Sequence, residues 1–479
     1  MVFSSITFLF FFLPVFLLGY LCVGKRGRNL FLLLASLFFY LWGEQLFVLV
    51  MLASININYV FGLLLDRAGM QGKSSKFLLA AALIANLGML GFFKYANFAV
   101  ENLNLLLSWV NMPVMHLEKE HLPIGISFFT FQAMSYLVDL YRQEYKAQKN
   151  PLYLGLYISL FPQLIAGPIV RYSDIAEHIK KRTVSLSDFS CGAERFIFGL
   201  GKKILIANPM GLMADQIFSM QVNSLSTGTA WLGILCYTLQ IYFDFSGYSD
   251  MAIGLGRMFG FHFLENFNYP YISRSIREFW RRWHISLSTW FRDYLYIPLG
   301  GNRHGNKRTN LNLLIVFLFC GLWHGASWNF ILWGLMYGFF LVMERGKWGG
   351  ILTGIHPVWQ HCYTLLVVIN GWVFFRIEQL AEAGSYFSVM YGFSGAERMH
   401  PRISMDCNAL FFCSFVAGIL LSLPLYPWMR IYWRIWTKEN YLAAVSVQAA
   451  KLVFTSTILL FAAGSISVGA YNPFIYFRF

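Results

Sequence analysis

Apolar segments long enough to cross a lipid bilayer recur from the start of this 479-residue chain to its end. A spanning helix needs about 20 mostly apolar residues. The composition agrees, because 57% of the residues are hydrophobic and only 13% are charged. That charged fraction is about half of what a soluble domain usually carries. We therefore predict an all-α polytopic membrane protein that forms a single domain over residues 1–479.

The apolar runs predict about eleven transmembrane helices, with additional re-entrant and interfacial helices. Residues 29–65 are interpreted as a hairpin, because basic residues flank both ends and Glu44 falls in the interruption between its arms. Residues 97–122 are typical of an interfacial helix followed by a polar loop. In residues 153–170, two prolines and a glycine interrupt helical hydrogen bonding. A broken segment of this kind survives in a membrane only where protein covers it or a wet cavity borders it.

The net charge of +14 indicates basic loops at an anionic cytoplasmic leaflet. Neither zinc-finger spacing nor a Gly/Arg-rich tail is present, so we expect contact with membrane lipids and no binding of nucleic acid. The first basic cluster follows the first apolar run, which predicts an external N-terminus and argues against a cleaved signal peptide. The seven cysteines include no C-x-x-C pair, and we expect no metal site.

Residues 273–308 combine positive charge with aromatic rings. On a continuous helix, Trp280, Trp283 and His284 would share one face. Arg277 and Arg281 would lie on the same side of that helix.

Two compatible interpretations follow for this segment. It could be an amphipathic helix lying on the membrane, with arginines among the headgroups and tryptophans at the boundary. It could also form a cytoplasm-facing pocket in which Arg277, Arg281 and Arg282 bind an anionic, phosphate-bearing substrate.

A buried histidine is expected just beyond this segment, in Gly-Leu-Trp-His-Gly-Ala-Ser-Trp-Asn (321–329). An apolar run begins at Leu311, and His324 lies 13 residues (324 − 311) further along it. That separation is about 20 Å along a helix, so His324 should lie well inside a bilayer. An ionisable residue there is costly and indicates function, and neutral imidazole can remove a proton from a hydroxyl. The alternative is a structural histidine bonded to a carbonyl or to Asn329.

Two other patterns carry less information. Asp244 and Asp250 are six positions apart and therefore on different helix faces, which favours arginine partners or a polar cavity over paired-carboxylate catalysis. The glycines at 254, 256 and 260 follow a membrane span and do not form a dinucleotide-binding fingerprint. Close helix packing explains them better.

Residues 277–303 and 321–328 together resemble the membrane-bound O-acyltransferase (MBOAT) family, most closely its bacterial branch that acetylates alginate or peptidoglycan. Further matching stretches lie along nearly the whole chain, in residues 123–132, 161–169, 242–250 and 472–477. The resemblance implies an active site in a central membrane tunnel, with residues 273–330 as the catalytic segment. The family's two histidines fall on His324, in Trp-His-Gly, and on His284, in Arg-Trp-His-Ile-Ser.

The resemblance also implies the substrates. The donor would be cytoplasmic acetyl-CoA, used as a substrate with no cofactor bound. Its phosphates suit the arginine-rich segment. We expect the substrate-binding residues to be Arg277, Arg281, Arg282, Trp283, Trp323 and Asn329.

Relatives of this branch pass the acetyl group across the bacterial cytoplasmic (inner) membrane. An external, periplasmic SGNH-hydrolase-like acetyltransferase partner then places it on a polysaccharide acceptor. Alginate-like exopolysaccharide is the leading acceptor and peptidoglycan the second. The Ile-Pro-Leu-Gly-Gly-Asn-Arg stretch (297–303) favours acetylation over D-alanylation of teichoic acid.

Two alternatives come from other functional classes. A polyanion transporter would use the arginines as a binding patch and His324 as a proton relay. The sequence shows no inverted repeat to support it. A structural scaffold would give no reason for burying His324.

Overall fold

The computed structural model describes residues 2–69, 73–118, 121–393, 407–438, 440–469 and 471–475. Throughout these ranges the regular elements are helices, and no strand occurs among them. The prediction of an all-α protein is therefore confirmed.

Long apolar helices establish a multi-pass membrane protein. In the described ranges, five helical stretches are long and apolar enough to cross a bilayer. They are Arg28–Ala68, Ser74–Trp109, Leu186–Phe218, Pro357–Arg376 and Tyr441–Ser467. A sixth is reached if the bent pair Ala409–Leu421 and Leu425–Thr437 forms one span. The expected count of about eleven is not confirmed, because several expected spans form helices that are too short or too polar.

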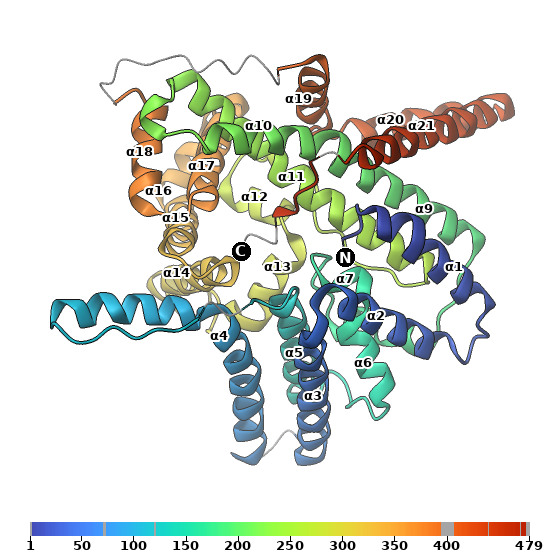
Figure 1. Ribbon diagram of the computed structural model, residues 1–479, viewed down its shortest axis with the longest axis horizontal. Coiled ribbons are helices and arrows are strands. Elements are labelled where there is room, and N and C mark those ends of the chain that lie inside the picture. Colours follow the sequence, from blue (N-terminus) through green and yellow to red (C-terminus); the bar gives the residue numbers. More distant parts are fainter. Residues whose placement is uncertain are drawn as a thin grey trace.

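The centre of the molecule is α11 (Thr227–Met258), which is buried over most of its length. It packs against α9 (Leu186–Gly201) and α10 (Asn208–Phe218), which run beside it in Figure 1. A Cβ added to Gly254 would lie 2.6 Å from the carbonyl oxygen of Gly192, so the α9 and α11 backbones nearly touch. This confirms close packing as the role of Gly254.

The N-terminal region begins with the π-helical segment Thr7–Phe12, continued by α1 (Leu13–Cys22). The chain then forms α2 (Arg28–Glu44), α3 (Val48–Ala68), α4 (Lys73–Trp109) and α5 (Ile126–Tyr141). The expected break after Glu44 is present. However, α2 packs chiefly on α6 (Pro151–Ser159), whereas α3 packs on α4 and α5, so the two arms do not form a tight hairpin. Figure 1 shows α4 changing direction part-way along its length.

The expected broken segment lies where α6 ends. Leu160 separates α6 from the short α7 (Phe161–Leu164), and the irregular backbone that follows runs to α8 (Tyr172–Lys180). Residues 154–170 are all buried. Protein therefore covers the broken backbone, as predicted.

Trp280, Trp283 and His284 do not lie on one continuous helix, on which they would have shared a face. The chain forms α12 (Ile276–Arg282) and α13 (Ile285–Phe291), separated by an extended Trp283 and a left-handed His284 with φ of 43°. A π-helical segment, Arg292–Tyr296, follows α13. The break turns Trp283 and His284 into the core, although no glycine or proline marks it.

The segment that contains His324 is formed by two helices whose backbones nearly touch. They are α14 (Gly305–His324) and α15 (Trp328–Arg345). A Cβ on Gly334 would overlap the carbonyl oxygen of Phe317, so this crossing requires glycine. Beyond it follow α16 (Lys347–Gly354), α17 (Pro357–Arg376) and α18 (Leu380–Met390).

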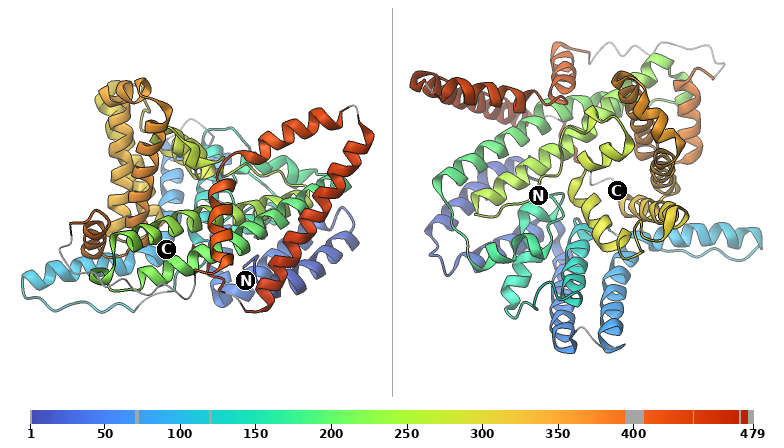
Figure 2. Two further views of the ribbon diagram at one scale, coloured as in Figure 1. Left: turned by 90° about the horizontal axis from the view of Figure 1, so that it is seen from above. Right: turned by 180° about the vertical axis from the view of Figure 1, so that it is seen from behind.

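Three helices complete the described part of the chain. They are α19 (Ala409–Leu421), α20 (Leu425–Thr437) and α21 (Tyr441–Ser467). The first two are bent by 67° relative to each other, and Figure 2 shows α20 and α21 as an arm at one side. After this arm, residues 471–475 return to the middle of the molecule in Figure 1.

Candidate active site

His324 is the last residue of α14, and its side chain lies in an aromatic cavity. The helix ends there because Gly325 adopts an extended conformation. The cavity measures about 10 Å³, enough for about one water molecule. Besides His324, its walls are Ile241 and Phe245 of α11, Trp283, Trp333 of α15, Trp372 and Phe375 of α17, and Ile475.

Aromatic rings surround the imidazole of His324. Ring centroids of Trp323 and Trp333 lie 4.9 Å away and that of Phe375 lies 5.1 Å away, all in edge-to-face geometry. Neither ring nitrogen has a hydrogen-bond partner among the described residues. The alternative of a structural histidine bonded to Asn329 is therefore not met, and the Asn329 amide instead donates to the carbonyl of Ile377. The geometry leaves an imidazole that can accept a proton.

His284 is buried and fixed in one orientation. Its Nδ1 lies 3.1 Å from Oδ1 of Asn266, which also accepts hydrogen bonds from the backbone N–H and the hydroxyl of Ser286. A backbone N–H can only donate, so this amide atom must be the oxygen. In the neutral ring, His284 Nδ1 therefore carries the proton.

Trp323 joins the two predicted histidines. Its ring centroid is 4.9 Å from that of His324 and 5.9 Å from that of His284. It also contacts Phe128 and Phe131 of α5. The structure thus gathers His284, His324 and Trp323, with Trp283 in the cavity wall.

None of the three predicted arginines, Arg277, Arg281 and Arg282, lines the cavity around His324. Arg277 and Arg281 are exposed on α12, whereas Trp283 and His284 are buried, so the expectation that they share one side is wrong. The break after Arg282 is the physical reason. Arg282 itself donates to Glu278 at 2.9 Å and to the carbonyl of Asn268 at 3.1 Å.

A chain segment that sequence reasoning missed also forms the cavity wall. Ile475 donates its N–H to Asp244 Oδ2 at 2.9 Å, and Lys203 donates to the carbonyl of Pro473. Lys203 and Asp244 form a buried ion pair with each other. The charged pair in an apolar context was visible in the sequence, but its link to residues 471–475 was not.

The expected arginine partner is found for Asp250, whereas Asp244 pairs with a lysine instead. Asp250 pairs with Arg195 at 2.8 Å and with Lys202 at 2.6 Å, on a different face of α11 from Asp244.

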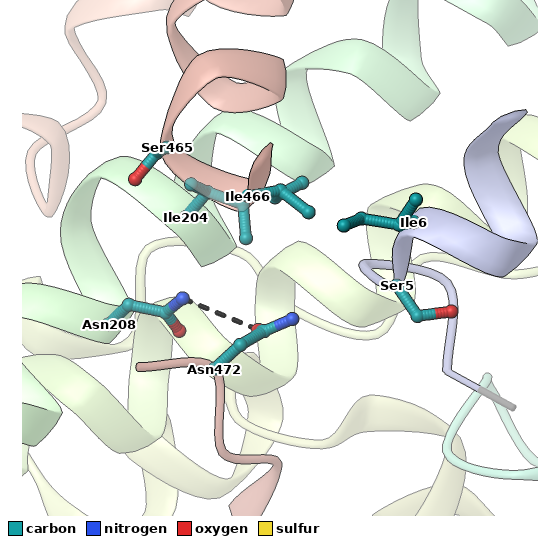
Figure 3. Close-up of a pocket in the computed structure, with 7 residues that line it drawn as sticks. All are labelled: Ser5, Ile6, Ile204, Asn208, Ser465, Ile466 and Asn472. Atoms are coloured by element: carbon teal, nitrogen blue, oxygen red, sulfur yellow. Dashed lines mark hydrogen bonds between the residues drawn. The ribbon is translucent and has the colours of Figure 1, made fainter. Parts of the chain in front are cut away.

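A larger cavity, about 200 Å³, lies outside the histidine cluster (Figure 3). It is lined by Ser5, Ile6, Ile204, Asn208, Ser465, Ile466 and Asn472, and the Asn208 amide donates to Asn472. Its lining contains no ionisable side chain. We therefore place the candidate active site at the smaller cavity, which contains His324.

A charged cluster stands on the segment between α13 and α14. Arg171 lies 2.8 Å from Asp293, and Arg142 donates to the Asp293 carbonyl. Partial burial raises the pKa of Asp293, but the hydrogen bond from Arg292 and the charge of Arg171 outweigh it and hold that pKa below its ordinary value. Asp293 is therefore ionised at neutral pH and joins the loop before α8 to this segment.

Among the described residues, no group of three or more His, Cys, Asp or Glu side chains could hold a metal ion.

Comparison with known proteins gives one consistent result. A family model described as MBOAT, membrane-bound O-acyltransferase family, matches residues 94–347. The chain is 42% identical to a probable alginate O-acetylase AlgI of Pseudomonas putida over the full length of both chains. It is 47% identical to that of Pseudomonas aeruginosa, covering 82% of this chain and 75% of the relative. A peptidoglycan O-acetyltransferase of Helicobacter pylori is 38% identical, covering 84% and 81% respectively.

Proposed function

Because the chain belongs to the membrane-bound O-acyltransferase family, we propose that it passes acetyl groups from cytoplasmic acetyl-CoA across the bacterial inner membrane to an exported polysaccharide. A relative named for alginate O-acetylation matches the whole chain, which favours an alginate-like acceptor. A relative named for peptidoglycan acetylation makes peptidoglycan the second candidate. An external hydrolase-like partner would complete the transfer.

His324 is the proposed general base, and the observation that carries this role is its unpartnered imidazole in an aromatic cavity. A ring nitrogen takes the proton of an acceptor hydroxyl, and the hydroxyl oxygen attacks the thioester carbonyl carbon. The new ester C–O bond forms as the C–S bond breaks. The imidazolium returns its proton to the departing thiolate, which leaves as CoA.

His284 is proposed to support this step from the far side of Trp323. Its hydrogen bond to Asn266 fixes the ring, and both histidines contact Trp323. We assign Trp323 and Asn329 to shaping the site around the acyl group, since both are buried and the Trp323 ring contacts that of His324.

Arg277 and Arg281 are proposed to bind the phosphates of the donor. They are exposed on α12, which leads directly to Trp283 in the cavity wall. An extended donor could therefore place its phosphates along α12 and its acetyl group near His324. Arg282 is already engaged by Glu278 and would hold α12 in shape.

The decisive experiment is turnover of labelled acetyl-CoA by the full chain in lipid nanodiscs with envelope extract. We expect His324→Ala to abolish turnover and His304→Ala, at an exposed histidine, to leave it unchanged. Turnover that survives in His324→Ala contradicts the general-base assignment. If wild-type protein consumes no acetyl-CoA, the acetyltransferase proposal fails and a transporter becomes the better hypothesis.

A further inference from the structure

A lysine and a tyrosine from α4 cap the end of the helix that carries His324. Lys94 Nζ donates to the carbonyl of Trp323 at 2.5 Å and to that of His324 at 3.2 Å. The Tyr95 hydroxyl donates to the carbonyl of Leu322 at 2.5 Å. The last carbonyls of a helix have no partner within the helix, and a cation there is favourable. Together Lys94 and Tyr95 satisfy three of them.

The same face of α4 also holds the chain beyond His324. Phe98 packs on the Trp328 ring with centroids 5.9 Å apart, and Asn102 accepts a hydrogen bond from Trp328 Nε1 at 2.9 Å. Lys94, Phe98 and Asn102 are spaced by four residues, so they form one stripe along the helix. The turn between α14 and α15 is therefore fixed at both ends by α4.

Lys94 stands in an apolar part of the chain, directly after Phe92 and Phe93. An ionisable residue in such a segment is costly and indicates a function. Its ammonium group meets backbone carbonyls rather than an acidic side chain. The carbonyls that it binds belong to Trp323 and His324, and this explains why a lysine stands at this position.

We propose that Lys94 is a positioning residue for His324. Because no described residue bonds the imidazole nitrogens, the ring is placed only by aromatic packing and by its own backbone. Lys94 fixes that backbone by binding the His324 carbonyl. The inference rests on the proposed role of His324 as general base.

The test compares Lys94→Met, Lys94→Arg and Lys76→Met in the acetyl-CoA turnover assay with full-length protein in nanodiscs. Lys76 is an exposed lysine of the same helix and serves as the matched control. Misplacing a catalytic group by about 1 Å can cost about 100-fold in rate. We expect Lys94→Met to lower kcat about 100-fold while KM for acetyl-CoA stays unchanged. Lys94→Arg should restore most of kcat, and Lys76→Met should behave as wild type.

A kcat for Lys94→Met equal to that of Lys76→Met would overturn the inference, as would a Lys94→Arg variant as slow as Lys94→Met. If Lys94→Met does not fold, Tyr95→Phe decides, because it removes only the hydroxyl that binds Leu322. We expect a smaller loss of kcat at constant KM, and an unchanged kcat contradicts the cap. If His324→Ala retains turnover, the proposed base fails whatever the Lys94 variants do. If His324→Ala loses turnover but Lys94→Met keeps wild-type turnover, only the positioning role fails.

Discussion

Lys203 and Asp244 form an ion pair with 2.8 Å between Nζ and Oδ1, and each side chain is only 2% exposed. Both partners also hold the chain segment that reaches the cavity: Lys203 binds the carbonyl of Pro473, and Asp244 binds the N–H of Ile475. The pair therefore connects the helical core to one wall of the candidate active site.

We expect Lys203→Met to lower the free energy of unfolding by about 3–5 kcal/mol, because it leaves the Asp244 charge buried and unpaired. Thermal unfolding in detergent measures the loss. Adding Asp244→Leu should recover most of the stability, since an apolar pair can replace a buried ion pair. Acetyl transfer should stay low in the double variant, because residues 473–475 have lost both anchors.

Lys202→Met is the matched control for this series. Lys202 is more exposed than Lys203, and its partner Asp250 keeps Arg195, so the expected loss is below about 1 kcal/mol. Equal unfolding temperatures for Lys202→Met and Lys203→Met would contradict the importance of the buried pair.

Asn266→Ala should slow acetyl transfer about 10-fold or more, because His284 loses the acceptor that orients its ring. Ser286 loses the same acceptor, so a stability loss of about 1–3 kcal/mol should accompany it. Steady-state turnover and thermal unfolding measure the two effects. Asn268→Ala, at an exposed site two residues away, should change neither. An Asn266→Ala enzyme with wild-type kcat would show that His284 needs no fixed orientation.

Gly334→Ala should destabilise the protein by about 1–3 kcal/mol, the usual cost of overpacking. Its methyl group would overlap the Phe317 carbonyl and push α14 away from α15, so turnover should fall as well. In the control Gly384→Ala, the added Cβ meets nothing within 4 Å, and stability should be unchanged or slightly higher. The prediction fails if both variants unfold at the same temperature.

Arg281→Ala should weaken acetyl-CoA binding about 10-fold and leave kcat nearly unchanged, because a charged hydrogen bond of about 1.5–3 kcal/mol is lost far from the reacting atoms. Binding isotherms at two salt concentrations measure the effect, which should shrink at high salt. Arg434→Ala, at an exposed arginine of α20, should bind the donor as wild type does. Unaltered affinity in Arg281→Ala would contradict the donor-binding role.

The sequence was sufficient to predict the helical class, the broken segment at 161–168 and the burial of His324. These features depend on local hydrophobicity and on prolines, which a single segment reveals. The sequence also singled out His284, which the structure places near Trp323, but it gave no sign of the helix break at that residue. The break before α13 is stabilised by Asn266, and no local signal at Trp283 or His284 announces it.

The remaining parts of the site depend on contacts between distant segments. Lys94 meets carbonyls about 230 positions later, and Asp244 meets Ile475 at a similar separation. Periodicity reports which face of a helix is apolar, but not which other helix covers it. Lys94 nevertheless had a usable signal, because a lysine flanked by aromatic residues in an apolar run is expensive to bury.

The small size of the cavity bears on how much acyl donor the proposed reaction would lose to water. With space for about one water molecule beside His324, the resting protein offers little solvent that the base could direct against an activated acyl group. Under the proposed function, an acceptor larger than water reaches the imidazole only if the aromatic rings move apart. Under the proposed function, so small a cavity would limit the water that can reach the donor and break it down before an acceptor arrives.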